Sequence, residues 1–445
     1  MSQSLVINVP DYVNRNRMSS MQTLVVALCS LVILLDGFDT QVISFVAPLL
    51  AQKLGVKVSD FGPVFGAGLF GLTVGALFIG PFADRYGRKI MICLSVVAFG
   101  VFSFATIWVE TFSQLLLVRF LTGLGLGAAM PNVIAMTAEF APARLKATLV
   151  SGTFAAFPLG AVIGGALSAK LVPIYGWEVV FIGGGILPIV FAIFLAVLLP
   201  ESIRFLVNRG GRQVRVAKLL SRIDPKHKFT GQEQFVSGEV MLAGRAVAEL
   251  FRGGRATMTL LLWVPYFTCL LMLFFMYSWL PSLMTKAGLP ISTAIFATVL
   301  FNLGGVLGAL VQGSLIDRYG YFRVLGFAYT AAAICFAAVG FLAVPSIFLM
   351  VVIVVAGACA VGAQCGANAL TTSLYPTSIR ATGIGWALGI GRIGSIVGPV
   401  VGGILISMNW NNKQLFIMAG LPGLLATLAI IALAALVRRR KLMVQ

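Results

Sequence analysis

Long apolar runs alternate with short polar segments along almost the whole chain. A run of about 18 or more apolar residues is long enough to cross a bilayer as a helix. The first run follows a polar segment and lacks a small-residue cleavage site, so we expect a retained helix rather than a signal peptide. The pattern predicts an all-α integral membrane protein with twelve transmembrane helices, at about 21–50, 60–82, 90–109, 112–138, 147–170, 178–199, 257–283, 291–314, 323–343, 346–372, 382–408 and 413–437.

The charges are few and unevenly placed. Only 10% of the 445 residues are charged, yet the net charge is +18. Lysine and arginine gather in the two tails and in every second loop, which is the distribution of cytoplasmic segments. We therefore expect both termini to be cytoplasmic, and we interpret the basic tail at 438–441 as a topology anchor with affinity for anionic lipid rather than a nucleic-acid site. The basic residues on the opposite side are Lys53, Lys57, Lys170, Lys286 and Lys413.

Residues that commonly carry enzyme chemistry are scarce. All six cysteines lie inside predicted helices, and the single histidine, His227, lies in the central polar segment. This pattern offers no metal-ligand spacing and no pairing of a nucleophile with a base. The sequence predicts no metal, no cofactor, no disulfide and no enzyme.

Two segments of the first half recur in the second half at nearly the same interval. "GPFADRYGRK" (80–89) recurs as "GSLIDRYGYF" (313–322), and "APARLKAT" (141–148) recurs as "YPTSIRAT" (375–382). We predict two copies of a six-helix unit, residues 1–200 and 256–445, joined by a cytoplasmic linker at 201–255. Parallel repeats of this kind form transporters whose binding site lies between the halves, near the bilayer midplane.

The chain resembles the major facilitator superfamily over essentially its whole length. The resemblance is carried by the loop signature at 80–89, its weaker repeat, and "PESIRFL" at 200–206. Within that superfamily, "DGFDT" (36–40), "LLLVRFLTGLGLG" (115–127) and Arg392 resemble the aromatic acid:proton symporter family. The resemblance implies the major facilitator fold of two pseudo-symmetric halves. It also implies proton-coupled import of benzoate-type acids such as 4-hydroxybenzoate and protocatechuate.

The resemblance also implies an ion-pair relay at the cytoplasmic ends of the helices. Asp84 and Arg88 of the loop signature would meet Glu139 at the end of the fourth helix, and Asp317 and Arg318 would be their counterparts in the second copy. The second copy lacks an acid equivalent to Glu139, so we expect its lock to be weaker. Such a relay would close the inner gate; the alternative is that these residues only cap local turns.

Four charges lie well inside predicted helices: Asp36, Asp39, Arg119 and Arg392. A charge at the bilayer centre costs about 3 kcal/mol on insertion scales, so each should face a cavity or a partner. Asp36 and Asp39, at i and i+3, share one face of the first helix. Two carboxylates in one poorly solvated cavity can exchange a proton near neutral pH, and we expect Arg119 to tune that exchange. The alternative is an Asp36–Arg119 pair that only joins two helices.

Arg392 is the candidate anchor for the substrate. It lies near the middle of the glycine-rich eleventh helix, and its planar guanidinium can hold both oxygens of a carboxylate. The alternative is a structural hydrogen bond to a backbone carbonyl. Aromatic side chains can enclose a ring and an amide can bind its hydroxyl; the candidates are Phe38, Tyr277, Trp386 and Asn302.

Together these features predict a monomeric transporter that imports an aromatic monocarboxylate with protons. Two alternatives stay open. Proton-driven efflux is the first, because exporters often carry a Gly-Pro-x-x-Gly-Gly element in the fifth helix; here that helix reads "FPLGAVIGG" and "GPVVGG" lies in the eleventh. A sensor that binds aromatics without moving them is the second. The short linker and the lack of a signalling domain favour a transporter over a sensor.

Overall fold

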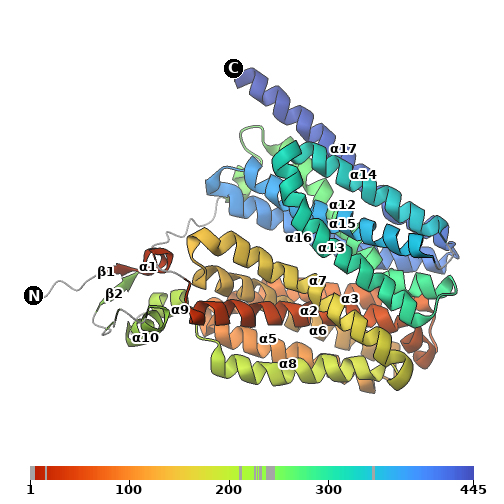
Figure 1. Cartoon of the computed structure of the whole chain (residues 1–445), viewed down its shortest axis with the longest axis horizontal. Helices are drawn as coiled ribbons and strands as arrows, with labels where there is room; N and C mark the ends of the chain where they lie inside the picture. The colour runs from red at the N-terminus through yellow and green to blue at the C-terminus, as the bar shows by residue number, and fades with distance from the viewer. Residues whose placement is uncertain are drawn as a thin grey trace, which may run out of the picture.

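Twelve long helices lie roughly side by side in the computed structural model (Figure 1). The structure describes residues 6–15, 18–209, 213–224, 227, 229, 233–236, 246–342 and 346–444. Within these residues, twelve helices are long and apolar enough to cross a membrane, as predicted. The helices that supply these spans are α2 (Ser20–Leu54), α3 (Phe61–Val74), α5 (Arg88–Ala105), α6 (Phe112–Phe140), α7 (Ala143–Tyr175), α8 (Glu178–Leu198), α12 (Ala256–Lys286), α13 (Ile291–Tyr319), α14 (Tyr321–Phe341), α15 (Ile347–Leu374), α16 (Thr377–Ser407) and α17 (Asn412–Val444).

The ends of these helices follow from short polar signals in the sequence. Ser19 precedes α2 and Thr111 precedes α6, and each forms a capping box with a glutamine three residues later. Such a box satisfies backbone N–H groups that the first helical turn leaves unpaired. At the other end of α2, Gly55 adopts a left-handed conformation (φ 65°) that ends the helix.

The sequence repeat has a structural counterpart in the two halves. Gly87 and Gly320 have φ values of 105° and 83°, so both repeated loops turn through a conformation that favours glycine. Pro142 and Pro376 stand immediately before α7 and α16. The same turn therefore connects equivalent helices in each copy.

The second membrane span is less regular than the sequence pattern predicts. After α3 the backbone widens into a π-helical turn at Gly75–Ile79, tightens at Gly80–Phe82, and ends in the short helix α4 (Ala83–Tyr86). Gly71 and Gly75 allow this irregular segment to approach α6 so closely that an added Cβ would overlap carbonyl oxygens of α6. Close backbone approach thus replaces side-chain packing along this helix pair.

Both chain termini lie at one end of the bundle, which we call the terminal end; the opposite end is the far end (Figure 1). One apolar core includes the later part of α2, the start of α3, and much of α12, α13 and α15. A second core contains only helices of the first half together with segments at the terminal end. The two halves therefore share a hydrophobic core toward the far end.

Short elements gather at the terminal end of the first half. Strand β1 (Val6–Asn8) pairs in parallel with β2 (Gln234–Val236), between α1 (Val9–Arg15) and the linker helices. The side chain of Asn14 accepts a hydrogen bond of 2.7 Å from the backbone N–H of Ala143, at the start of α7. The N-terminal segment is thereby joined to both the linker and α7. The linker helices are α9 (Ile203–Asn208), α10 (Gln213–Ile223) and α11 (Ala246–Glu249).

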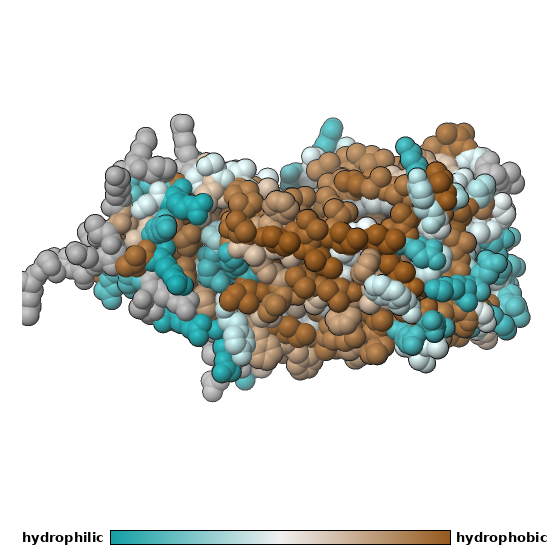
Figure 2. Space-filling model, turned by 90° about the horizontal axis from the view of Figure 1, so that it is seen from below, coloured by the Kyte–Doolittle hydropathy of each residue, from teal (hydrophilic) through white to brown (hydrophobic). Residues whose placement is uncertain are grey.

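The surface divides into three zones. Figure 2 shows an apolar band across the middle of the molecule, with hydrophilic residues gathered toward both ends. This distribution is what a bilayer requires of a helix bundle that spans it. The predicted boundaries of the halves, at residues 200 and 256, stay a prediction.

Candidate functional site

Asp36 and Asp39 lie near the middle of α2, and both are almost completely buried, with 1% and 0% of their surface exposed. Gly37, between them, allows α7 to approach so closely that a Cβ there would overlap the carbonyl oxygen of Phe157. Two carboxylates thus lie inside the bundle, as the sequence predicts, and each must find its partners on neighbouring helices.

Asp39 is held by two helices of its own half. Arg119 of α6 places Nη2 3.4 Å from Asp39 Oδ2 and donates to the Asp39 carbonyl oxygen at 3.1 Å. The hydroxyl of Ser103, on α5, donates to the other carboxylate oxygen. Arg119 is itself buried, with 3% of its surface exposed. The helix-joining pair that the sequence left open therefore forms with Asp39 rather than with Asp36, because Asp39 is the carboxylate that faces α6.

Asp36 has a different set of neighbours. Thr40, one turn along α2, donates to Asp36 Oδ1 at 3.1 Å, whereas Oδ2 is buried and hydrogen-bonds no described residue. Arg392, on α16 of the other half, lies close enough to interact electrostatically with Asp36. Arg392 also donates to the sulfur of Met130 at 3.5 Å. Asp39 is thus ion-paired within its own half, whereas Asp36 interacts electrostatically with an arginine of the other half without forming an ion pair among the described residues.

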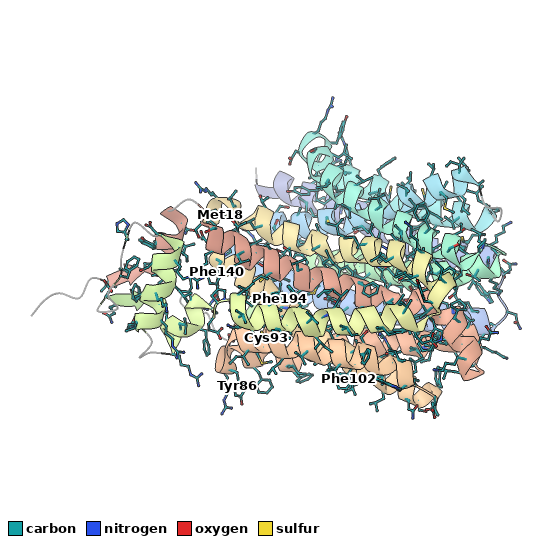
Figure 3. The ribbon with its side chains drawn as sticks, turned by 60° about the horizontal axis from the view of Figure 1, so that its bottom comes forward. Met18, Tyr86, Cys93, Phe102, Phe140 and Phe194 are labelled. Carbon is teal, nitrogen blue, oxygen red and sulfur yellow. The ribbon has the colours of Figure 1, made fainter. Side chains whose placement is uncertain are left out.

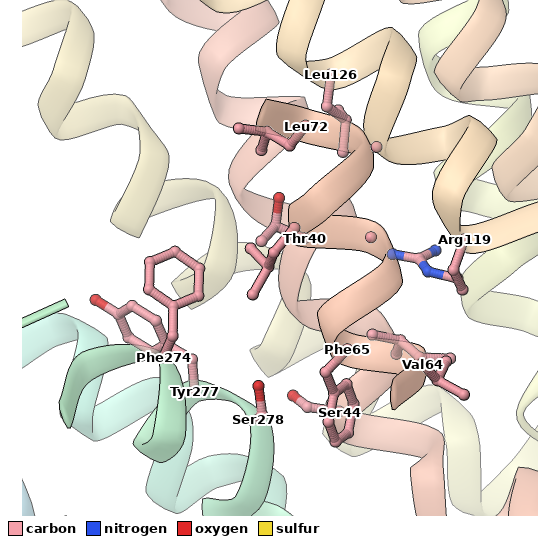
Figure 4. A pocket seen from close by; sticks show the side chains of 14 residues that line it. Thr40, Ser44, Val64, Phe65, Leu72, Arg119, Leu126, Phe274, Tyr277 and Ser278 are labelled. Carbon is pink, nitrogen blue, oxygen red and sulfur yellow. The ribbon is translucent and has the colours of Figure 1, made fainter. Parts of the chain in front are cut away.

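A small cavity lies beside this cluster, between α2, α3, α6 and α12. Its walls come from both halves of the chain, so it lies at their interface. In Figure 4, Arg119 lies on one side of the cavity and Ser278 on the other, whereas the hydroxyl of Tyr277 points away from Arg119. The cavity is thus lined by one cation, several hydroxyls and mostly apolar side chains: Thr40, Ile43, Ser44, Val64, Phe65, Gly68, Leu69, Leu72, Arg119, Gly123, Leu126, Phe274, Tyr277 and Ser278.

Of the four ring- and hydroxyl-binding candidates, only Tyr277 lines this cavity. Phe38 points instead between α7 and α8, where Gly164 and Gly184 leave room for its ring. Trp386 is 44% exposed and stacks on Trp263 with ring centroids 6.1 Å apart. The prediction that these two rings enclose the substrate does not fit this cavity, because the faces of α2 and α16 that carry them turn toward other helices.

Asn302 also has another role in this structure. Its side-chain amide and that of Gln41 exchange two hydrogen bonds, of 3.1 and 2.9 Å, and both residues are buried. Gln41 lies on α2 and Asn302 on α13, so this pair joins the two halves. The amide predicted to bind a ring hydroxyl is therefore occupied by a partner within the protein.

The predicted relay at the terminal end is partly formed. Arg88 forms an ion pair with Glu139, and Glu139 also accepts a hydrogen bond of 2.6 Å from the Ser202 hydroxyl. These contacts lie at the end of the bundle where Figure 3 labels Tyr86 and Phe140. Asp84, in contrast, is exposed and has no ion-pair partner among the described residues. The relay therefore joins α5, α6 and the start of the linker, without Asp84.

The second copy of the relay has a different arrangement. Asp317 and Arg318 are both exposed, and the Arg318 guanidinium lies over the ring of Tyr319, 5.3 Å from its centroid. Within the part of the chain that the structure describes, Asp317 forms no ion pair. The first copy of the relay thus contains an ion pair and the second contains none among the described residues, which agrees with the lack of an acid equivalent to Glu139 in the second copy.

Several residues of the site were not singled out from the sequence. Ser103, Gln41 and Ser278 carry no sequence signal, because a hydroxyl or amide in an apolar helix is common. Glu201 is different: its carboxylate accepts from the backbone N–H of Lys89 at 3.0 Å, which ties the linker to α5. It belongs to the "PESIRFL" segment, so that motif could have identified it.

Comparisons with known proteins agree with this architecture. The family model described as Major Facilitator Superfamily matches residues 29–346 and, in a second match, residues 262–444. A solved structure of the xylose transporter from E. coli, in a partially occluded inward open conformation, has a TM-score of 0.70 at 19% identity, covering 92% of this chain and 97% of that one. The chain belongs to the major facilitator superfamily, and the predicted fold is confirmed.

Relatives with higher identity match nearly the full length. The chain is 41% identical to a 4-hydroxybenzoate transporter of Pseudomonas aeruginosa, over 96% of this chain and 95% of that protein. It is 40% identical to a gallate transporter of Pseudomonas putida, with the same coverage. It is 32% identical to a benzoate transport protein of Acinetobacter baylyi, over 95% of this chain and 92% of that protein. The resemblance inferred from the sequence is confirmed: the protein is a multi-pass membrane transporter and not an enzyme.

Proposed function

We propose that this protein imports an aromatic monocarboxylate together with protons across a bacterial inner membrane, as a monomer with both termini in the cytoplasm. The relatives named above support the substrate class, since their names specify 4-hydroxybenzoate, gallate and benzoate. The observation that carries the proposal is the pair of wholly buried aspartates beside a central cavity that also contains an arginine. The aspartates can bind a proton, and the arginine and the apolar lining can bind an organic anion.

The energetics of the membrane explain why protons accompany the substrate. Moving a monovalent anion into a cell against a negative-inside potential opposes about 2.3 kcal/mol per 100 mV. One co-transported proton cancels the charge, and a second makes the potential favour uptake. Asp36 and Asp39 are the proposed proton carriers. Asp36 Oδ2 is buried without a hydrogen-bond partner among the described residues, and Asp39 would need a proton whenever Arg119 is engaged by another anion.

The arrangement of the halves supports alternating access. With cytoplasmic termini, the far end faces the periplasm. Beyond Asp39 toward that end, the halves meet through the Gln41–Asn302 pair, and Trp279 of α12 lies against Phe65 of α3 with ring centroids 5.2 Å apart. We assign this state as closed to the periplasm. Asp84 would then find its partner only after the cytoplasmic ends close, which is why we keep it in the proposed inner gate.

Uptake into proteoliposomes tests this function. Purified protein should accumulate labelled 4-hydroxybenzoate, benzoate or gallate when the outside is made acidic, and accumulation should stop when a protonophore removes the gradient. Protein-free liposomes measure the diffusion of the neutral acids. Accumulation only under the reversed gradient would indicate efflux, and specific binding without any gradient-driven movement would indicate a sensor.

A further inference from the structure

Of the two terminal nitrogens of the Arg119 guanidinium, one has a partner and the other has none among the described residues. Nη2 is engaged with Asp39, whereas Nη1 is buried and hydrogen-bonds no described residue. A buried guanidinium N–H without a partner is unfavourable, since its lost hydration is not replaced. Because Arg119 also lines the central cavity, a ligand in that cavity can supply the missing acceptor.

Arg392 is placed less favourably for this task. It does not line the cavity; its guanidinium donates to the Met130 sulfur and lies near Asp36. The sequence made Arg392 the anchor because no acid on its own half could pair with it. The structure brings an acid of the other half, Asp36, near enough to interact electrostatically with it, although the two form no ion pair among the described residues.

The wall opposite Arg119 offers a hydroxyl. Ser278, on α12, lines the cavity, and its side chain forms no hydrogen bond with a described residue. The rings of Phe65, on α3, and Phe274, on α12, also line the cavity. The cavity thus has a cation on one side, a serine hydroxyl on the other side and aromatic rings in its lining (Figure 4).

We propose that Arg119, rather than Arg392, binds the carboxylate of the substrate through Nη1, and that Ser278 binds a hydroxyl group on its ring. This inference rests on the proposed function, and it adds which residues orient the substrate. It also explains how hydroxylated and unsubstituted benzoates can be told apart, because a site that hydrogen-bonds a substrate hydroxyl discriminates against the analogue that lacks it.

The same geometry links substrate binding to a proton. Arg119 balances the charge of Asp39, so a second carboxylate on the same guanidinium leaves a net negative charge in a buried site. A proton on Asp39 removes that excess. The other titratable or charged groups that face this cluster from adjoining helices are Asp36, Arg392 and Tyr277. Substrate binding should therefore take up about one proton from solution.

Calorimetry on purified protein in detergent tests the anchor. Arg119→Lys should weaken 4-hydroxybenzoate binding tenfold or more, because lysine lacks the fork geometry, and Arg392→Lys should weaken it much less. Arg119→Ala leaves Asp39 unpaired, so the double variant Arg119→Ala/Asp39→Asn keeps the test valid if the single variant misfolds; it should also bind at least tenfold more weakly. Size-exclusion chromatography checks folding.

The outcomes separate the two proposals. If the wild-type protein binds none of the three aromatic acids, the proposed function is wrong. If the wild type binds but both Arg119 variants bind equally tightly, or if Arg392→Lys loses the affinity instead, the anchor is not Arg119. Repeating the titration in buffers of different ionisation enthalpy counts the protons; about one per substrate is expected for the wild type, and none for Asp39→Asn.

A matched pair of serines tests the hydroxyl contact. Ser278→Ala should reduce the preference for 4-hydroxybenzoate over benzoate by about fivefold or more, with little change in benzoate binding itself. Ser282→Ala, one turn further along α12 and outside the cavity lining, should leave the preference unchanged. Equal preference in wild type and Ser278→Ala, or an equal loss in Ser282→Ala, would overturn the assignment of Ser278.

Discussion

In the proposed orientation, the Gln41–Asn302 pair holds the halves together on the periplasmic side of Asp39, and the strength of this contact can be estimated. Its two hydrogen bonds join α2 to α13, and both side chains are buried. Neutral hydrogen bonds contribute about 0.5–1.5 kcal/mol each, so the pair should favour the closed state by about 1–3 kcal/mol. Because both amides can be hydrated when the halves separate, removing the pair should raise the fraction of outward-open protein by about 5- to 150-fold.

The assay is the labelling of a buried cysteine from outside the cell. Val299 of α13 packs at the same interface, where its side chain lies against Gly165 of α7. In a variant without native cysteines, Val299→Cys should react with a membrane-impermeant maleimide only when the periplasmic end opens. Asn302→Ala and Gln41→Ala should each increase the labelling rate, and the double variant should add little, because either change alone removes the pair.

A control variant distinguishes this effect from general loosening. Asn368→Ala also removes an amide hydrogen bond, here from the Tyr266 hydroxyl at 2.8 Å, but both of these residues belong to the second half. It should leave the labelling rate nearly unchanged. The reasoning is refuted if Asn302→Ala labels at the parental rate, or if Asn368→Ala accelerates labelling as much.

Three further changes test other parts of the account. Asp36→Asn and Asp39→Asn should each abolish accumulation driven by a pH gradient while leaving some exchange of substrate, because each removes a protonation step; normal accumulation in either variant would exclude that aspartate. Asp84→Asn should reduce transport more than Asp317→Asn at matched expression, since the first copy retains the complete set of relay residues; equal defects would contradict an asymmetric lock. Asn14→Ala should destabilise the protein by about 1 kcal/mol, because α7 loses the side chain that caps its start; thermal unfolding measures this, and an unchanged midpoint would show that the cap contributes nothing.

The fold was predictable because a helix that spans a bilayer must be long and apolar, and both properties can be read from the sequence. Each of the twelve spans was recognisable as an apolar run, and the equivalent turns at Gly87 and Gly320 were recognisable as a repeated sequence motif. The π-helical turn at Gly75–Ile79 was not, since it depends on how closely α6 approaches. Length and hydropathy therefore define the number of helices but not their local irregularities.

The candidate site was predictable only in its charges. Asp36 and Asp39 stand out because a carboxylate in an apolar run is costly, whatever surrounds it. Their separate partners depend on how α6 and α16 are rotated and crossed, which one sequence does not reveal. Aromatic residues are less informative still: Phe38 fills a gap between α7 and α8, while Tyr277 lines the cavity, and both are single aromatic residues in apolar helices.

The central claim is that substrate and protons move together, and proton flux tests it most directly. Proteoliposomes containing an internal pH dye, with no initial gradient, should acidify inside when 4-hydroxybenzoate is added outside. The initial rate should exceed that of protein-free liposomes, and liposomes with Asp39→Asn protein should match the protein-free rate. The account would be contradicted if labelled substrate entered through the wild-type protein at the same rate as through the variant, and if the wild-type liposomes became no more acidic than the protein-free ones.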